Sequence, residues 1–193
     1  MTVDNPAPAT VVNGSGNRII AGPLTSDSSQ HSIIPTRAYT GTAEYALEQE
    51  RVFSSGWVWA GFAHWVDEPG KVHPVSIGGK PLLIVRDEEQ RIRVFHNSCR
   101  HRGMVMMEEP AKVRRRIQCA YHCWSYKLDG SLNATPYLKR ERGREVPQGA
   151  EHLGLLGVSS HVWAGMVFVN LGVEFDSTEA AAADFEGMLS PIL

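Results

Sequence analysis

Apolar and polar residues alternate over most of the middle of the chain, with the period of two that is typical of half-buried β-strands. Short turn signals separate these segments: Gly78-Gly79, Asp129-Gly130 and Ala164-Gly165 each stand between two of them. The predicted strands cover residues 72–77, 81–86, 91–96, 124–128, 131–134, 158–162 and 166–171. Because hairpins connect neighbouring strands, the pattern predicts a mainly β fold, an antiparallel barrel or sandwich.

Two segments have the period of a helix instead. Residues 43–53 place a stripe on one helical face, made of Tyr45, Ala46, Gln49, Val52 and Phe53. Near the C-terminus, Asp176 as N-cap and Glu179 three residues later predict a second helix. We expect its apolar stripe to cover a surface of a further domain. That stripe consists of Phe185, Met188, Leu189 and Ile192.

The N-terminal region has a different composition from the rest of the chain. Its first thirty-odd residues are rich in Asn, Ser, Thr, Gly and Pro, without a basic start or an apolar core. This composition excludes a conventional secretory signal and predicts a flexible arm over residues 1–40. A length of 193 residues suits one domain, or one domain with attached parts of another. A hydrophobic fraction of 42% and a formal net charge of −2 are ordinary for a globular protein. No apolar run approaches the length of a membrane span.

The candidate chemistry lies in two short motifs that contain two of the three cysteines. Cys99 and His101 form a C-x-H motif, Cys119 and His122 form a C-x-x-H motif, and seventeen residues lie between the two motifs. This is the ligand set of a Rieske 2Fe-2S cluster, in which two thiolates hold one iron and two imidazoles hold the other. We predict that Cys99 and Cys119 bind the buried iron and that His101 and His122 bind the outer iron.

A structural zinc site is the alternative for two cysteines and two histidines. Zinc ligands are usually grouped as a cysteine pair and a histidine pair. Here each half of the motif holds one cysteine and one histidine, so the pattern favours the 2Fe-2S cluster. The six other histidines have no metal-ligand spacing: His31, His64, His73, His96, His152 and His161.

The residues around the ligands add a family resemblance. Residues 95–103 and 119–130 resemble the motifs of the alpha (oxygenase) subunit of Rieske non-haem iron aromatic ring-hydroxylating oxygenases, and the similarity runs from about Tyr45 to about Gly172. The resemblance implies a Rieske-type β domain in which two hairpin loops hold the cluster. One departure is Cys123, where the family commonly has a glycine or another small residue, and we do not count it as a ligand.

The resemblance also implies how the chain is organised. Short helices flank the β domain and belong to an incomplete α+β catalytic domain. That domain holds mononuclear non-haem Fe(II) with two histidines and one carboxylate. No histidine follows His161, so we expect this iron site to lie outside the chain, which would then transfer electrons only. The expected parts are the arm (1–40), an N-terminal helix (41–56), the Rieske 2Fe-2S domain (57–172) and the start of a truncated catalytic domain (173–193).

The expected partners follow from the same resemblance. Electrons would come from NAD(P)H through a reductase, sometimes with a ferredoxin, and pass to the mononuclear iron of a homo-oligomer or an alpha/beta hetero-oligomer. Aromatic rings are the commonest substrates of the family. The alternative is a stand-alone Rieske-type ferredoxin. Such carriers resemble only the cluster domain, whereas this chain has about forty residues before its first helix and a helix-forming tail after its last strand.

Cysteine usage bears on the compartment and the potential. Rieske proteins of respiratory complexes carry an extra cysteine in each ligand loop and join the loops by a disulfide, whereas Met104 and Tyr121 stand in those places here. No disulfide is expected, which fits a reducing cytoplasm. Without that link and, by resemblance, without extra hydrogen bonds to sulfur, we expect a potential toward the low end of the Rieske range of roughly −150 to +300 mV.

Positive charge is concentrated around the second motif. Residues 100–144 contain eleven Lys or Arg against four Asp or Glu, most densely at Lys112, Arg114, Arg115 and Arg116. No aromatic platform or nucleic-acid motif accompanies these charges, so we predict no nucleic-acid partner. A docking face for an acidic electron donor or for a neighbouring subunit explains their sign and position. A simply solvated basic face is the other reading.

Overall fold

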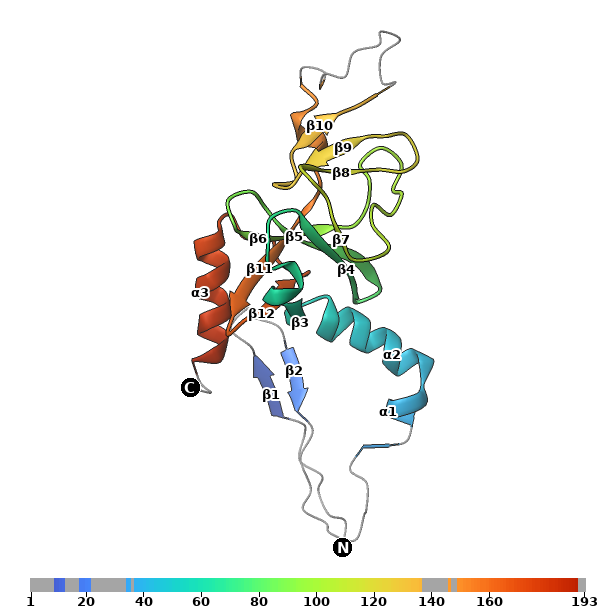
Figure 1. Ribbon diagram of the computed structural model, residues 1–193. Helices are drawn as coiled ribbons and strands as arrows, with labels where there is room; N and C mark the ends of the chain where they lie inside the picture. Colours follow the sequence, from blue (N-terminus) through green and yellow to red (C-terminus); the bar gives the residue numbers. More distant parts are fainter. Residues whose placement is uncertain are drawn as a thin grey trace, which may run out of the picture. The chain divides into compact units, whose positions relative to one another are not determined.

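The computed structural model describes residues 9–12, 18–21, 34–35, 37–136, 146 and 149–190. They belong to two compact units, Met1–Tyr45 and Ala46–Leu193 (Figure 1). In the first unit, β1 (Ala9–Val12) and β2 (Arg18–Ala21) form an antiparallel hairpin, and the short helix α1 (Arg37–Thr40) follows along the chain. Apart from residues 34–35, the rest of the predicted N-terminal arm lies outside the described residues.

The helix predicted over residues 43–53 is confirmed. It consists of α2 (Thr42–Glu48), which runs directly into a π-helical turn, η1 (Gln49–Phe53). Neither part contains a buried residue: the side chain of Tyr45 is 62% exposed and that of Val52 is 56% exposed. The predicted stripe on this helix therefore lies at the surface.

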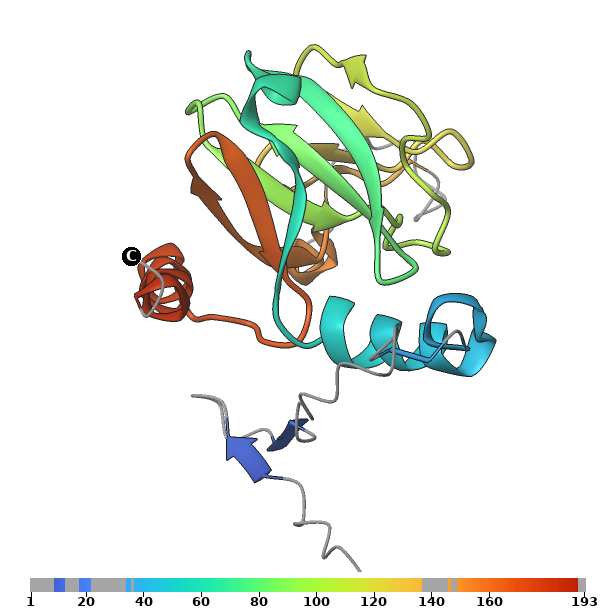
Figure 2. The same cartoon turned by 90° about the horizontal axis from the view of Figure 1, so that it is seen from below.

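The second unit is built on a curled, seven-stranded antiparallel sheet (Figures 1 and 2). Its strand order is β3-β12-β11-β6-β5-β4-β7. The bounds are Trp57–Phe62 (β3), Met166–Asn170 (β12), Gly157–Trp163 (β11), Ile92–His96 (β6), Lys80–Arg86 (β5), Lys71–Ile77 (β4) and Ala111–Lys112 (β7). The predicted mainly β, antiparallel class is confirmed, although the sheet closes only half a barrel.

A smaller, three-stranded sheet carries the second ligand motif. It has the order β10 (Leu132–Ala134), β9 (Ser125–Lys127) and β8 (Arg116–Gln118). Two 3-10 turns, η2 (Ala63–Val66) and η3 (Glu151–Leu153), lie in the connections. No helix of the described chain combines the length and apolar character needed to span a bilayer.

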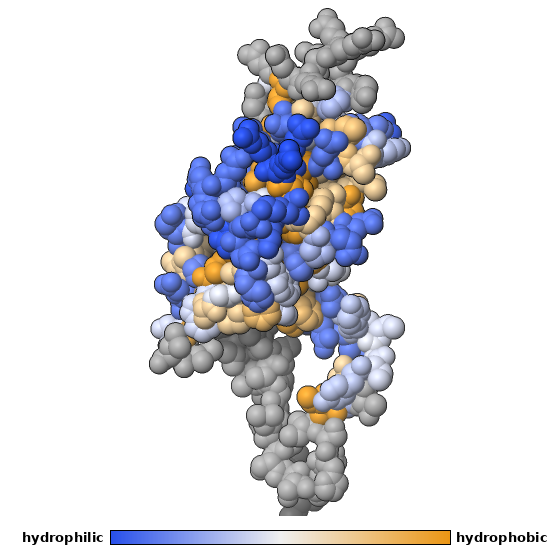
Figure 3. All heavy atoms as spheres, in the orientation of Figure 1, coloured by the Kyte–Doolittle hydropathy of each residue, from blue (hydrophilic) through white to orange (hydrophobic). Residues whose placement is uncertain are grey.

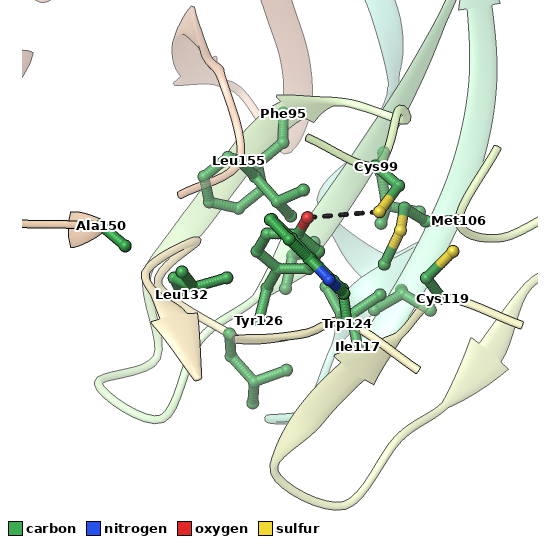
Figure 4. Close-up of a cluster of buried hydrophobic side chains, with 14 residues drawn as sticks. Phe95, Cys99, Met106, Ile117, Cys119, Trp124, Tyr126, Leu132, Ala150 and Leu155 are labelled. Carbon is green, nitrogen blue, oxygen red and sulfur yellow. Dashed lines mark hydrogen bonds between the residues drawn. The ribbon is translucent and has the colours of Figure 1, made fainter. Parts of the chain in front are cut away.

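Strand β5 lies at the centre of the core because it is buried on both faces. Leu82 and Ile84 pack into one apolar cluster, and Leu83 and Val85 into the other. The second cluster joins the large sheet to the small one and includes Tyr126 of β9 (Figure 4). It also contains Cys99 and Cys119, so the core itself holds the two predicted thiol ligands.

Two turns fix the hairpins that lead to the first ligand loop. Gly78 and Gly79 connect β4 to β5 with φ angles of 57° and 71°, the left-handed values that a tight hairpin needs. Between β5 and β6, the buried Asp87 carboxylate accepts hydrogen bonds from the backbone N–H groups of Glu89 (2.9 Å) and Arg91 (2.8 Å). These local bonds fix the turn between β5 and β6 and thus the register in which the two strands pair. The first ligand loop follows directly after β6.

Two strands of this unit do not show the alternation of apolar and polar residues from which the other strands were predicted. The segment of β3 is almost continuously apolar and shows no alternation, yet it forms the edge of the large sheet beside β12. In β8 only Ile117 of three residues is buried, and a run of three is too short to show a period. Both strands are recognisable only through their partners in the sheet.

The C-terminal helix α3 (Thr178–Leu189) forms as predicted but begins one residue later. Ser177, and not Asp176, is its N-cap, and its hydroxyl accepts a hydrogen bond from the Ala180 N–H at 3.1 Å. Phe185 is fully buried, and its ring contacts those of Trp57, His161, Trp163 and Phe168. The expectation that the stripe covers a further domain is therefore wrong for Phe185, because this unit's own sheet covers it.

Candidate metal centre

The first ligand loop follows β6 and is closed by backbone hydrogen bonds around Cys99. The Cys99 N–H donates to the Met104 carbonyl, and the Gly103 N–H donates to the Cys99 carbonyl, both at 2.8 Å. Asn97, which is 2% exposed, fastens the base of the loop. Its amide donates to the Met107 carbonyl at 2.6 Å, and its oxygen accepts from the N–H groups of Met106 and Met107.

The second ligand loop connects β8 to β9 and repeats the same pair of bonds. The Cys119 N–H donates to the Trp124 carbonyl at 2.8 Å, and the Cys123 N–H donates to the Cys119 carbonyl at 3.1 Å. In each loop the cysteine is thus bonded to the residues four and five positions later. Two short loops of nearly the same backbone design therefore present the C-x-H and C-x-x-H motifs.

All four predicted ligands come together at these loops. Cys99 and Cys119 are 3% and 2% exposed, and the rings of His101 and His122 lie 4.7 Å apart between centroids, nearly perpendicular to each other. Burial and the neighbouring Cys119 raise the pKa of the Cys99 thiol. The cysteines thus lie on the inner side of the site and the partly exposed histidines on the outer side.

Two aromatic side chains hold the imidazoles in place. Trp124 is 3% exposed, and its ring stacks on that of His101 with centroids 4.9 Å apart and planes 10° from parallel. Tyr121 packs its ring against His122 at 3.8 Å and is itself exposed. Desolvation and the neighbouring His122 lower the pKa of His101, which favours the neutral imidazole, the form that binds metals.

One nitrogen at this site has an unsatisfied bonding capacity. Nδ1 of His122 is buried and has no hydrogen-bond partner among the described residues. A buried polar atom normally has a partner, and an imidazole nitrogen with a free lone pair is able to bind a metal. The donor set of two thiols and two imidazoles, with this open nitrogen, fits a Rieske cluster.

Tyr126 is a residue of the site that the sequence interpretation missed. Its side chain is fully buried, and its hydroxyl lies 3.3 Å from the Cys99 sulfur and accepts a hydrogen bond from the Arg100 N–H at 3.0 Å (Figure 4). Burial, together with the adjacent Cys99, raises the pKa of the Tyr126 phenol, so it remains a donor. The expectation that the sulfur lacks extra hydrogen bonds is therefore wrong.

A signal for Tyr126 was present in the sequence. Trp124, Tyr126 and Leu128 alternate with less apolar residues along β9 and the two residues that flank it, so all three side chains lie on one face and join the same apolar cluster. Since Trp124 directly follows the second ligand loop, that face is the one beneath the cluster site. The period of two along this strand would therefore have indicated that both Trp124 and Tyr126 lie beneath the cluster site.

The remaining candidates lie apart from the site or at its rim. Cys123 is exposed and has a φ angle of 58°. Met106 is buried in the cluster that contains Cys99 and Cys119, whereas Met104 is 41% exposed. His73, on β4, stacks on Trp65 with ring centroids 4.2 Å apart. In the part of the chain that the structure describes, no three or more His, Cys, Asp or Glu side chains are placed to hold a single metal ion.

Comparison with known protein families identifies the type of domain that contains this site. The family model of the Rieske [2Fe-2S] domain matches residues 56–155, which include both ligand loops. The chain belongs to the Rieske [2Fe-2S] domain family. Chloroplastic choline monooxygenase from Spinacia oleracea is 34% identical over 137 residues, which cover 71% of this chain and 30% of the relative. Biphenyl dioxygenase subunit alpha from Metapseudomonas furukawaii is 30% identical over 159 residues, 80% of this chain and 35% of the relative.

Solved structures agree with these relatives. A quaternary ammonium Rieske monooxygenase, CntA, has a TM-score of 0.62 and 26% identity over 82% of this Rieske chain and 45% of its own. Naphthalene 1,2-dioxygenase from Rhodococcus sp. has a TM-score of 0.62 and 29% identity. This match covers 76% of this chain and 32% of the dioxygenase chain. The predicted resemblance to Rieske oxygenase alpha subunits is confirmed. This Rieske chain spans about a third of the length of the two curated relatives.

Proposed function

We propose that this chain transfers single electrons through a 2Fe-2S cluster held by Cys99, His101, Cys119 and His122. The observation that carries the proposal is the convergence of two loops of matching backbone design, which bring two buried thiols and two imidazoles together. When bound, such a cluster accepts and releases one electron, at a potential that imidazole ligation raises above that of all-cysteine clusters.

Burial supports a division of roles among the four ligands. Cys99 and Cys119 would hold the inner iron because their side chains are almost completely buried. His101 and His122 would hold the outer iron, with the open Nδ1 of His122 as one donor. The imidazole edges are the parts of the site nearest the surface, so they are the natural exit for an electron.

The order of the ligands along the chain supports the 2Fe-2S cluster over the zinc alternative. Zinc ligands are usually grouped as a cysteine pair and a histidine pair. Each loop here supplies one cysteine and one histidine, so that each iron of a two-iron cluster can receive its two protein ligands from the two loops.

We infer that the intact protein is a Rieske oxygenase. Its cluster would receive electrons from a reductase or ferredoxin and pass them to mononuclear non-haem Fe(II) in a catalytic domain outside these residues. Choline monooxygenase and biphenyl dioxygenase subunit alpha among the relatives support oxidation of a quaternary ammonium compound or an aromatic ring. A cytoplasmic homo-oligomer or alpha/beta hetero-oligomer fits this system.

The extent of the similarity favours this function over a stand-alone ferredoxin. The match to biphenyl dioxygenase subunit alpha covers 80% of the chain and therefore exceeds the Rieske family match over residues 56–155. A carrier of ferredoxin type would share the cluster domain only.

The basic segment before the second loop is a candidate docking face for an acidic electron donor. Arg114, Arg115 and Arg116 are exposed, and they lie within five residues of Cys119. Lys112 is paired with Glu68 at 2.6 Å, so the three arginines supply most of the available charge. Hydrophilic side chains cover much of the upper and central part of the face shown in Figure 3.

Iron and sulfide analysis tests the proposal directly. Protein purified without oxygen is expected to contain two irons and two acid-labile sulfides per chain. After reduction it should give a Rieske-type electron paramagnetic resonance signal, with an average g below that of all-cysteine clusters. Stoichiometric zinc without sulfide would contradict the assignment.

A further inference from the structure

The two ligand loops belong to different sheets. The first loop follows β6 of the large sheet, and the second connects β8 to β9 of the small sheet (Figure 1). Among the described strands, no ladder of backbone hydrogen bonds joins the two sheets. The distance between the loops is therefore set by side-chain packing and by isolated hydrogen bonds between the sheets.

The turn between β9 and β10 is one place where the two sheets meet. Gly130 in this turn is buried, and its carbonyl accepts a hydrogen bond at 2.8 Å from the N–H of Leu155, which lies just before β11. Within the turn, the Asp129 carboxylate accepts from the N–H and the hydroxyl of Ser131 at 2.8 Å and 2.7 Å. These bonds hold Gly130 in a left-handed conformation, with a φ angle of 87°.

The backbone of Gly130 lies directly against the ring of Phe95. A Cβ atom added to Gly130 would lie 2.4 Å from Cε1 and 2.7 Å from Cζ of this ring, whereas ordinary contacts between carbon atoms are about 3.5–4.0 Å. Phe95 is 5% exposed, and β6 holds it between Leu83 of β5 and Gly157 of β11. Its ring belongs to the apolar cluster that contains both ligand cysteines (Figure 4). Position 130 therefore has no space for a side chain.

We propose that Gly130 is a positioning residue for the 2Fe-2S cluster, because its contact with Phe95 sets how closely the second ligand loop approaches the first. The inference rests on the proposed function. Phe95 lies four residues before Cys99 on the strand that leads into the first loop, and Gly130 lies on the hairpin that follows the second loop. Each iron would be bound by one ligand from each loop, so a shift of one sheet against the other changes both pairs of ligands at once.

A methyl group at position 130 would push the two sheets apart. To restore a carbon–carbon contact of about 3.5 Å, the ring and the turn would have to separate by about 1 Å. Distances from a metal to its ligands vary by only about 0.2 Å, so the loops must distort if the cluster is to stay bound. A Cβ in a left-handed conformation adds backbone strain of its own, which a control variant has to reproduce.

The test compares Gly130→Ala with wild type in the full chain. We expect the principal g values of the reduced cluster and its visible circular dichroism to shift, and cluster loss to a chelator to become about tenfold faster, as overpacking strain of the usual size would produce. The matched control is Gly165→Ala in the turn between β11 and β12, where φ is 78° and a Cβ meets no atom within 4 Å. This control has the backbone strain without the clash and should resemble wild type in all three measurements. Wild-type values in Gly130→Ala, or equal changes in Gly165→Ala, would overturn the proposal.

A double variant tests whether the effect passes through the Phe95 ring. Phe95→Leu removes Cε1 and Cζ, the two ring atoms that a Cβ at position 130 would meet first. The change caused by Gly130→Ala should therefore be smaller in the Phe95→Leu background than in wild type, as a double-mutant cycle measures. If Gly130→Ala alone retains no cluster, the double variant should still bind one, and an undiminished effect would refute the proposal. Failure of the proposed function is seen separately, because wild-type protein would then contain no 2Fe-2S cluster.

Discussion

Gly103 and Cys123 occupy equivalent positions in the two ligand loops. Each donates its backbone N–H to the carbonyl of the ligand cysteine four residues earlier, at 2.8 Å and 3.1 Å, and each has a left-handed backbone, with φ angles of 71° and 58°. Glycine adopts this conformation without cost, whereas a side chain with a Cβ is strained there. The structure thus explains why a glycine suits position 123 and why Cys123 is a costly departure.

Cys123→Gly should stabilise the protein and leave its visible spectrum near that of wild type. Relief of the left-handed strain, less the greater flexibility of glycine in the unfolded chain, is expected to add about 0.5–1 kcal/mol to the free energy of unfolding. Denaturant titration measures this change. Cys123→Ala is the control, since it removes the thiol but keeps the Cβ and should give no such gain. Loss of the cluster in Cys123→Gly would show that this position matters to the ligands or their packing.

Substitution of any proposed ligand should damage or abolish the cluster. The variants are Cys99→Ser, Cys119→Ser, His101→Ala and His122→Ala, and each removes one of only two protein ligands at an iron. Visible absorption and iron content measure the loss. His152→Gln serves as a control because His152 is an exposed histidine outside the loops, and its ring Nδ1 lies 2.8 Å from the nearby Gly149 carbonyl oxygen. Full cluster content in any of the four ligand variants would contradict its assignment.

Asp87 should make the stability of the β domain depend on acid pH. Burial opposes its ionisation, but the guanidinium of Arg93 at 2.7 Å and the N–H of Arg91 hold the pKa of this carboxyl below its ordinary value. The ionised form therefore stabilises the fold fully above the unfolded-state pKa of about 3.9. This contribution is lost as the pH falls through the lower folded-state pKa.

Asp87→Asn tests this role. The amide cannot accept all the bonds of the carboxylate and leaves the Arg93 guanidinium without its charged partner. We expect a loss of about 1–3 kcal/mol in the free energy of unfolding at pH 7 and a weaker dependence of stability on pH below about 4. Glu88→Gln, at an exposed neighbouring carboxylate, should change neither quantity appreciably. Equal acid sensitivity of Asp87→Asn and wild type would contradict this account.

The 193-residue chain should accept and release electrons without hydroxylating a substrate. Two of its eight histidines are expected to bind the cluster, and the described residues offer no group that could hold a further single iron. The assay supplies a reductase, ferrous iron and an aromatic or quaternary ammonium substrate, and analyses the products by mass spectrometry. Product formation coupled to consumption of reductant would reveal a catalytic iron site among residues assigned to structure.

The sequence alone predicted the ligand residues because their pattern is local. The cysteine and histidine of each motif are separated by one or two residues, so a single short loop fixes their distance whatever the rest of the chain does. The hairpins were predictable for the same reason, since Gly78-Gly79 and Asp129-Gly130 allow tight turns between alternating strands. The antiparallel β class followed from those hairpins.

Tertiary structure alone decided the contacts between segments that are distant in sequence. Tyr126 meets the Cys99 sulfur 27 residues away, and Phe185 is buried against Trp57 at the other end of the β domain. The edge strand β3 shows no period of its own and is ordered by pairing with β12. Periodicity tells which face of a segment is apolar, but only the folded packing determines which face it meets and which polar group lies within bonding distance.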